Sequence, residues 1–446
     1  MVAHRSRTVE APIVTDGLRR SLGLTHATAM VVGTIIGASI FVQPSEITRQ
    51  MPSVAGILFV WMAAGALTLC GALICAELAS AYPQTGGVYV FLKESCSPAV
   101  GFLWGWAMIW SMHSGIIAAI ATVFARYAAV FVPMNSWQQR IVAVAVIVIL
   151  SGINCVGVRH GGLVQNIFTA SKLVAIAAVI VAGLAWHGAP PVNPAASAAA
   201  GPRGFLLAMA AGLFAYGGWH MVTYAAGETR DPARIIPRAL LIGTLVVTAC
   251  YAGLNAIYLR VLPLDAVRQS SHVAADAAGV LLGAGGASLM AALVMVSTFG
   301  AVNGIILVGP RVYYSMAQDG LLFRWLGGVH PTFGTPARAI VVQAVWASVL
   351  ALTNTYGALF SRVIYTEWIF FAIMAAGLLR LRRRPDYKPA YRLWGTPVVP
   401  LLFIAASAIV VVMQVMAAPR DSLLGLGMVV AGLPVYFFWS SRERRT

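Results

Sequence analysis

Two stretches of the sequence place glycine and other small residues inside long apolar segments. The first is GTIIGASIF at 33–41, and the second is AAGLFAYGGWHMVTYAAGE at 210–228, with Gly217-Gly218 near its centre. Glycine lets the backbone leave the helical conformation without a Cβ clash. Non-helical backbone is tolerated at membrane depth only where it is buried in protein or lines a polar cavity. We interpret both stretches as interrupted membrane helices, although small residues at 33–41 are also typical of a close helix–helix contact.

An interrupted helix offers specific binding chemistry. The break leaves free N–H groups on one side and free C=O groups on the other. The N–H end attracts a carboxylate, and the C=O end attracts an ammonium. A ligand that carries both groups on one carbon is an α-amino acid, so the two breaks together indicate a substrate class.

The elements that must position these breaks are membrane helices. The chain of 446 residues is 59% hydrophobic and 10% charged, whereas soluble domains are about 25% charged. Apolar runs long enough to cross a bilayer recur along the whole chain. We therefore expect an all-α integral membrane protein with twelve transmembrane helices, at 23–47, 54–82, 98–132, 140–158, 164–186, 204–226, 237–261, 285–316, 338–354, 357–381, 395–417 and 423–440.

The interruptions fall in the first and sixth of these segments. Paired interruptions in corresponding helices of two halves are typical of transporters built from inverted repeats. This predicts a cytoplasmic N-terminal segment, a first repeat of helices 1–5, a second repeat of helices 6–10, two added helices and a cytoplasmic tail. The expected bounds are 1–22, 23–186, 204–381, 395–440 and 441–446.

The basic residues predict an orientation. The formal charge of +16 is unevenly spread: 21 Lys and Arg fall on the side of the termini and 8 on the other side. Basic residues concentrate in cytoplasmic loops, so both termini are expected in the cytoplasm of a multi-pass protein of the cell (inner or plasma) membrane. The run RLRRRPDYK at 380–388 is interpreted as an anchor beside anionic lipid headgroups of the bilayer, and nucleic acid is not expected as a partner.

Several motifs, in order, resemble those of the amino acid–polyamine–organocation superfamily, closest to its L-type amino acid transporter branch. They are GTIIGASIFV (33–42), AELASAYPQTGGVYVFL (76–92), VQNIFTASKLVAI (164–176), LFAYGGW (213–219), ETRDPARIIPRA (228–239), STFGAVNG (297–304), RVYYSMAQDGLL (311–322) and EWIFFAIMAAGLLRLRRRP (367–385). The resemblance implies a LeuT-type 5+5 inverted repeat, with helices 1 and 6 unwound at mid-membrane. It also implies amino acid transport by alternating access, often by exchange.

The resemblance further implies site residues. The substrate carboxylate would meet mainly backbone at Ile35, Ile36, Gly37, Ala38, Ser39 and Ile40. The ammonium and side chain would meet Phe214, Ala215, Tyr216, Gly217 and His220, with Phe214 as an aromatic lid. Ala38-Ser39 stands where the family usually has Ser-Gly, which alters the space around the carboxylate. For His220, a buried hydrogen-bonded role competes with substrate contact.

Lys172 is the one lysine inside an expected span. A charged residue inside a membrane span suggests a functional role by default, unless its side chain extends to the membrane interface. In the branch that this chain resembles, a fifth-helix lysine replaces the sodium ion that bridges helices 1 and 8. The resemblance therefore implies a built-in cation that bonds groups near Gly33 and a hydroxyl such as Ser297 or Thr298, and sodium-independent transport.

The remaining expectations concern reaction class and partners. The five cysteines match no metal or redox motif, and no hydrolase signature is present, so no enzyme activity, cofactor or metal is expected. The outer loop at 133–139 has no cysteine, so no disulfide-linked heavy subunit is expected. No acidic pair marks a site for cationic substrates, so neutral L-amino acids are favoured. Exchange competes with proton-coupled symport and with a non-transporting sensor. Glu77 is expected to act as a gate or cap, whereas Glu367 is left open between that role and a proton carrier.

Overall fold

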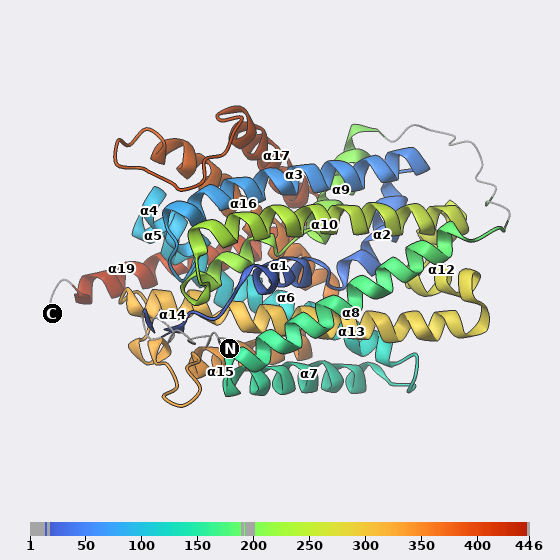
Figure 1. Ribbon diagram of the computed structural model, residues 1–446, viewed down its shortest axis with the longest axis horizontal. Coiled ribbons are helices and arrows are strands. Elements are labelled where there is room, and N and C mark those ends of the chain that lie inside the picture. The colour runs from blue at the N-terminus through green and yellow to red at the C-terminus, as the bar shows by residue number, and fades with distance from the viewer. Residues whose placement is uncertain (1–13, 16–17, 189–190, 192–200, 444–446) are drawn as a thin grey trace, which may run out of the picture.

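A computed structural model describes residues 14–15, 18–188, 191 and 201–443. Its helices lie side by side along one long axis and form a bundle (Figure 1). The segments 1–13 and 444–446, which include most of the expected N-terminal segment and half of the expected tail, lie outside the described residues.

Helices occur at all twelve expected positions. Seven of these spans are single helices, and the other five are built from two or three pieces. The helices and strands are β1 (Val14–Thr15), β2 (Leu18–Arg19), α1 (Leu24–Ile35), α2 (Ser39–Gln50), α3 (Val54–Ala81), α4 (Val88–Ser95), α5 (Pro98–Ala107), η1 (Met108–Met112), α6 (His113–Ala128), α7 (Ser136–Val156), α8 (Val158–Leu184), α9 (Pro202–Ala215), η2 (Trp219–Glu228), α10 (Pro232–Val261), α11 (Leu264–Gln269), α12 (Val273–Leu282), η3 (Gly283–Gly285), α13 (Gly286–Val308), α14 (Pro310–Gln318), η4 (Arg324–Gly327), α15 (Ala337–Thr353), α16 (Tyr356–Leu381), α17 (Val398–Ala417), α18 (Pro419–Val430) and α19 (Gly432–Glu443).

Length and composition support membrane spans. Within the described residues, nine helices are long and apolar enough to cross a bilayer, and the bent pair α1 and α2 raises this to ten. The shorter apolar helix α15 and the 26-residue α16 occupy the ninth and tenth expected positions. Among the described residues, strand pairing is limited to a short antiparallel pair, β1 with β2, and an isolated bridge between Leu22 and Thr229.

Local sequence signals explain where several helices begin. The Ser53 and Ser97 side chains accept hydrogen bonds from the backbone N–H groups of Gly56 and Val100, and so cap α3 and α5. Asn135 and Gln138 form a reciprocal capping box at the start of α7. These capping hydrogen bonds determine the residues at which α3, α5 and α7 begin.

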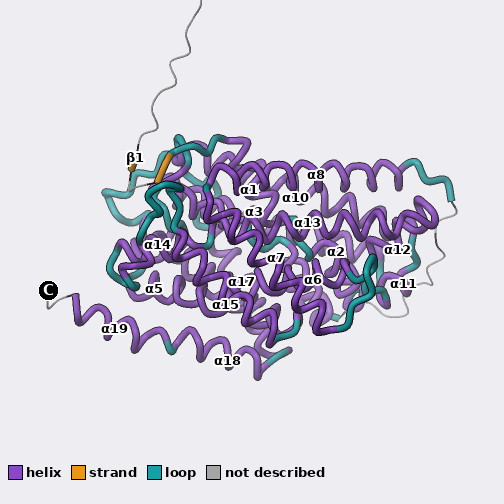
Figure 2. The backbone as a smooth tube through the Cα atoms, turned by 90° about the horizontal axis from the view of Figure 1, so that it is seen from below, coloured by secondary structure: helices purple, strands orange, loops and turns teal. Residues whose placement is uncertain are grey.

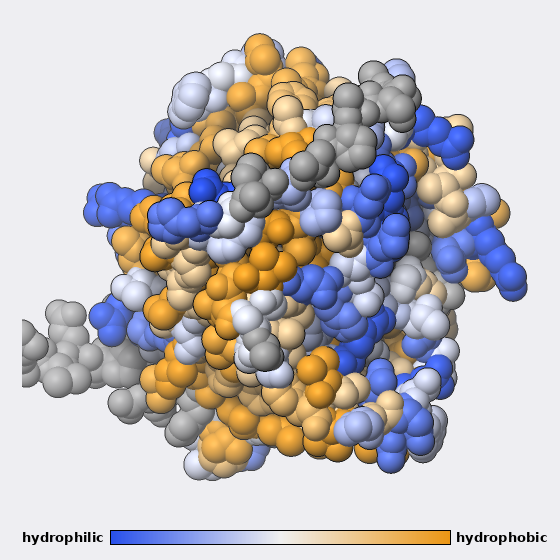
Figure 3. All heavy atoms as spheres, turned by 90° about the vertical axis from the view of Figure 1, so that its right-hand side faces the viewer, coloured by the Kyte–Doolittle hydropathy of each residue, from blue (hydrophilic) through white to orange (hydrophobic). Residues whose placement is uncertain are grey.

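The bundle has an apolar outer surface. Large apolar side chains on α8, such as Val174, Val181 and Leu184, are 64–70% exposed, as expected of a face in contact with lipid rather than water. The pair α18 and α19 lies along the edge of the bundle (Figure 2). At the end of the bundle near α12, hydrophilic side chains spread between apolar ones (Figure 3).

Candidate functional site

Helix 1 (α1 and α2) is broken in its middle. The helix stops at Ile35 and restarts at Ser39, with a bend of 43° between the two pieces. Ile36, Gly37 and Ala38 lie between them, so the unwound segment is shorter than the stretch from Ile35 to Ile40 expected from the sequence. The N–H groups in the first turn of α2 have few partners within their own helix, so this end can bind an anion.

Helix 6 (α9 and η2) is broken at the second glycine stretch. The α-helix stops at Ala215, and the chain restarts at Trp219 as a 3₁₀ helix. Gly218 has φ = 101°, a left-handed conformation that L side chains rarely adopt. A Cβ on Gly218 would lie 3.0 Å from the carbonyl oxygen of Thr34, so this glycine also permits close approach of helix 1.

The two breaks touch each other. The Thr34 hydroxyl lies 3.2 Å from the Gly218 carbonyl oxygen and can donate to it. The Tyr251 hydroxyl, from α10, lies 2.9 Å from the carbonyl oxygen of Ile35 and 3.0 Å from that of Ala215. One side chain therefore contacts the last carbonyl of both α1 and α9. The sequence expectations did not include Tyr251, and its distance along the chain from both breaks left no local signal.

Lys172 on α8 reaches the break in helix 1. Its ammonium donates to the carbonyl oxygens of Ile36 at 2.6 Å, Gly33 at 3.2 Å and Ser297 at 3.2 Å. The side chain is 2% exposed and does not snorkel to a surface. The Ser297 hydroxyl contacts the Ile36 and Gly37 carbonyls, whereas the Thr298 hydroxyl bonds carbonyls of its own helix. Lys172 thus joins helices 1, 5 and 8 through backbone oxygens.

A cavity of about 40 Å³ lies beside the two breaks, which is room for a few water molecules. Six of the expected site residues line it: Ile35, Gly37, Ala38, Ser39, Phe214 and Gly217. Further lining comes from α6 and α16, which contribute among others Ile116, Ile120, Tyr356, Leu359, Val363, Glu367, Trp368 and Phe371. The cavity is therefore mainly apolar, with helix ends on one wall.

The other expected site residues lie behind this wall. Ile36, Ile40, Ala215 and Tyr216 are buried in the core and are not among the lining residues. His220 also lies outside the lining, with its ring centroid 4.8 Å from Phe371 and 5.8 Å from Trp104. Its two ring nitrogens have no hydrogen-bond partner among the described residues, so it is buried as expected but not hydrogen-bonded.

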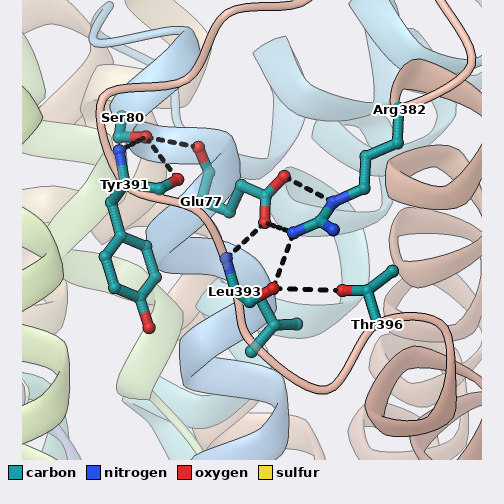
Figure 4. Close-up of polar contacts among 6 residues, drawn as sticks. All are labelled: Glu77, Ser80, Arg382, Tyr391, Leu393 and Thr396. Carbon is teal, nitrogen blue, oxygen red and sulfur yellow. Dashed lines mark hydrogen bonds and ion pairs between the residues drawn. The ribbon is translucent and has the colours of Figure 1, made fainter.

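Glu77 on α3 contacts Arg382 and the segment between α16 and α17 (Figure 4). Its carboxylate accepts from Arg382 at 2.8 and 2.5 Å and from the Leu393 backbone N–H at 2.7 Å. Ser80 forms two further bonds to the Tyr391 backbone. Hydrogen bonds with Glu77 raise the pKa of Arg382, which lies just after α16. These contacts give Glu77 a structural role, tying α3 to the segment between α16 and α17.

A second ion pair, between Arg311 and Glu228, lies at the same end of the protein. Arg311 and Glu228 form a bidentate pair at 3.0 and 3.2 Å, and both side chains are at most 2% exposed. The Glu228 carbonyl also accepts from the backbone of Ser21 and Leu22. Removing one partner of a buried ion pair strongly destabilises a protein. The contact between Arg311 and Glu228 therefore holds η2, α14 and the start of the chain together.

The described residues contain no group of His, Cys, Asp or Glu side chains that could hold a metal ion. The five cysteines are all free thiols. The site therefore consists of helix ends, one fixed ammonium, and an apolar cavity with a single carboxyl group in its described lining. Such a set can bind a zwitterion through its two main-chain charges.

Comparison with known proteins gives consistent results. A model of the family "Amino acid permease" matches residues 22–438. The serine/threonine exchanger SteT of Bacillus subtilis is 34% identical over 433 residues, covering 96% of this chain and 98% of SteT. The human large neutral amino acids transporter small subunit 2 is 30% identical, covering 96% of this chain and 82% of that protein. The human b(0,+)-type amino acid transporter 1 is also 30% identical, with coverages of 95% and 89%.

Proposed function

Because the chain belongs to the amino acid permease family, we propose that it exchanges neutral L-amino acids across the membrane without sodium, by alternating access. Membership makes the protein a multi-pass membrane transporter with the fold of that family. The sodium independence, the exchange mode and the neutral substrates are our proposal. The observation that carries it is the position of the Lys172 ammonium against the broken helix 1.

The Lys172 ammonium supports sodium independence by occupying the position of a cation. A sodium site at a helix break is built from carbonyl and hydroxyl oxygens, since hard cations bind oxygen ligands. Here three carbonyl oxygens from helices 1 and 8 already meet a positive charge at 2.6–3.2 Å. A sodium ion placed among them would face that charge at close range and be repelled.

The geometry of the breaks supports an amino acid substrate. The N-terminal end of α2 at Ser39 lines the cavity, and so do Phe214 and Gly217 at the end of α9. A carboxylate is favoured at the first end and an ammonium at the second. The roles of the lining residues as carboxylate and ammonium sites are part of this proposal, with Phe214 as the lid above them.

The orientation and location follow from the basic residues. We propose that both termini face the cytoplasm and that the protein resides in the cell membrane, since 21 Lys and Arg lie on that side and 8 on the other. The ion pair between Glu77 and Arg382 would then lie at the cytoplasmic end of the bundle. We further propose that the chain works without a disulfide-linked subunit.

The test uses the purified chain alone in proteoliposomes loaded with a mixture of neutral amino acids. Uptake of labelled amino acid should require internal substrate, and it should be unchanged when choline replaces sodium on both sides. A proton ionophore should leave the exchange rate unaltered. A sodium requirement would refute the proposed role of Lys172. Uptake into empty liposomes that collapses with the ionophore would instead show proton symport, and saturable binding without flux would show a sensor.

A further inference from the structure

One face of α16 contributes four residues to the cavity at intervals of four positions. They are Leu359, Val363, Glu367 and Phe371. Residues at this spacing lie above one another on one side of a helix. Three of them are apolar, so a single carboxyl group interrupts an otherwise apolar stripe.

Glu367 is buried, and one of its carboxyl oxygens is unpaired among the described residues. It is 5% exposed, and its Oε1 atom has no hydrogen-bond partner among the described residues. The ion pairs formed by the described part of the chain do not include it. It is also the one acidic or basic residue in the described lining of the cavity. The Glu367 carboxyl group therefore lies at the cavity wall with one oxygen that no described residue satisfies.

An unsatisfied buried acceptor costs free energy, and the cost is larger if the group is charged. Such a cost is recovered when a ligand brings a donor into the site. The two main-chain charges of an amino acid are already met by the helix ends in the proposed function. The group left to satisfy Glu367 is then a donor on the substrate side chain, and the small cavity limits that side chain to a short one.

We propose, resting on the amino acid exchange described above, that Glu367 is a specificity-determining residue that accepts a hydrogen bond from a short substrate side chain. The shared chemistry is a donor one or two bonds beyond Cβ, either a hydroxyl or an ammonium. A site with a buried acceptor discriminates against an analogue that lacks the donor, because its acceptor then stays unpaired. Substrates with short apolar side chains are therefore selected against.

The experiment compares serine, alanine and 2,3-diaminopropionate as ligands and as counter-substrates of the full-length protein. Binding is measured by thermal shift and exchange by flux in proteoliposomes. The wild type should favour serine or 2,3-diaminopropionate over alanine at least about tenfold. Wild-type protein that binds alanine as tightly as both donor-bearing ligands would overturn the inference without any variant.

Two variants of Glu367 distinguish a hydroxyl donor from an ammonium donor on the substrate side chain. Glu367→Met removes the acceptor at similar size and should bring the preference for donor-bearing ligands close to one. Glu367→Gln keeps a neutral acceptor, so a preference for serine should survive in it, whereas a preference for the cationic ligand should be lost. An unchanged ratio in the Met variant would refute the inference.

The matched control is Glu46→Gln, which changes a carboxylate that is 43% exposed and paired with Arg49 at 2.9 Å outside the cavity. It should leave all ligand ratios unchanged. Failure of the proposed function is distinguishable, because then no amino acid would bind or exchange in the wild type. Failure of the present inference alone leaves exchange intact with no preference for a donor.

Discussion

The two interrupted helices are held open by different means. In helix 1 the carbonyl oxygens of Gly33 and Ile36 meet a full positive charge, the ammonium of Lys172, while that of Ile35 accepts from neutral donors. In helix 6 the turn is made by Gly218 in a left-handed conformation, and the freed carbonyls meet neutral donors. These donors are the Gly217 N–H, 2.9 Å from the Phe214 oxygen, and the Tyr251 hydroxyl at Ala215.

We infer from this difference that the two breaks bind different groups of the substrate. The carbonyl end of helix 1 is already satisfied by a cation, so it has little attraction left for a substrate ammonium, and its N–H end remains available to a carboxylate. The carbonyl end of helix 6 is met by neutral donors only and still attracts positive charge. A zwitterion bound between the breaks is therefore oriented, which supports the proposed site roles.

The largest expected effect is loss of the charge at helix 1. Lys172→Met should insert and fold but lose exchange about 100-fold, because three buried carbonyls lose a charged donor worth ~3 kcal/mol in total. Flux in proteoliposomes measures this, with size-exclusion profiles as the check on folding. The control Lys388→Met removes an exposed lysine and should be neutral. Full activity of the Lys172 variant would remove the contrast between the breaks.

The second prediction concerns the left-handed turn in helix 6. Gly218→Ala should lower exchange more than tenfold and lower the melting temperature, since an L side chain at this φ costs ~1–2 kcal/mol and meets the Thr34 oxygen. The matched variant is Gly217→Ala, whose Cβ would meet only the Phe214 oxygen, at 3.1 Å. It should cost clearly less. Equal losses in the two variants would show that the conformation of Gly218 is not what shapes the break.

The third prediction tests the link between the breaks. Tyr251→Phe removes one hydroxyl and leaves the ring, whose centroid lies 4.9 Å from that of Tyr216 and 5.4 Å from that of Trp61. Exchange should fall about three- to tenfold, as expected for ~1 kcal/mol. Tyr258→Phe on the same helix is the control, because its buried hydroxyl has no partner among the described residues. If both variants behave alike, the two breaks are held independently.

The smallest expected effect is on equilibrium binding after loss of the lid. Phe214→Ala should slow exchange several-fold while changing the dissociation constant less than about twofold, since a lid controls occlusion more than first contact. Isothermal titration and flux measurements on the same preparation test this. A proportional loss of both would mean that Phe214 is a wall of the cavity.

The sequence predicted the fold well because the membrane imposes it. All twelve expected helix positions hold helices, and the family assignment is confirmed by the match over residues 22–438. Apolar length and glycine clusters are local signals, so both breaks were predictable. The domain bounds and the roles of the site residues stay predictions. Small elements such as α11 and α12, in the connection after α10, were not expected, because their apolar runs are too short to suggest a span.

Long-range contacts were less predictable. Nothing near Tyr251 indicates that its hydroxyl meets Ile35, 216 positions earlier. His220 directly follows the GGW motif, yet the 3₁₀ turn that begins at Trp219 points it into an aromatic cluster instead of the cavity. Glu367 offered a usable signal, namely one acidic residue in an apolar stripe with a spacing of four. Which side of α16 faces the cavity depends on packing, and the sequence pattern alone does not state it.

Tyr251 has one hydroxyl proton and two carbonyl oxygens within reach. A single proton can point well at only one of them. The Ile35 oxygen also accepts from the Gly37 N–H at 2.8 Å, so the Ala215 oxygen is the one that lacks this donor whenever the hydroxyl points at Ile35. A protonated amine arriving at helix 6 supplies the missing donor and lets the hydroxyl settle on helix 1. Binding of an amine at the break in helix 6 would then change the hydrogen bonding at the break in helix 1 through the rotation of a single O–H bond.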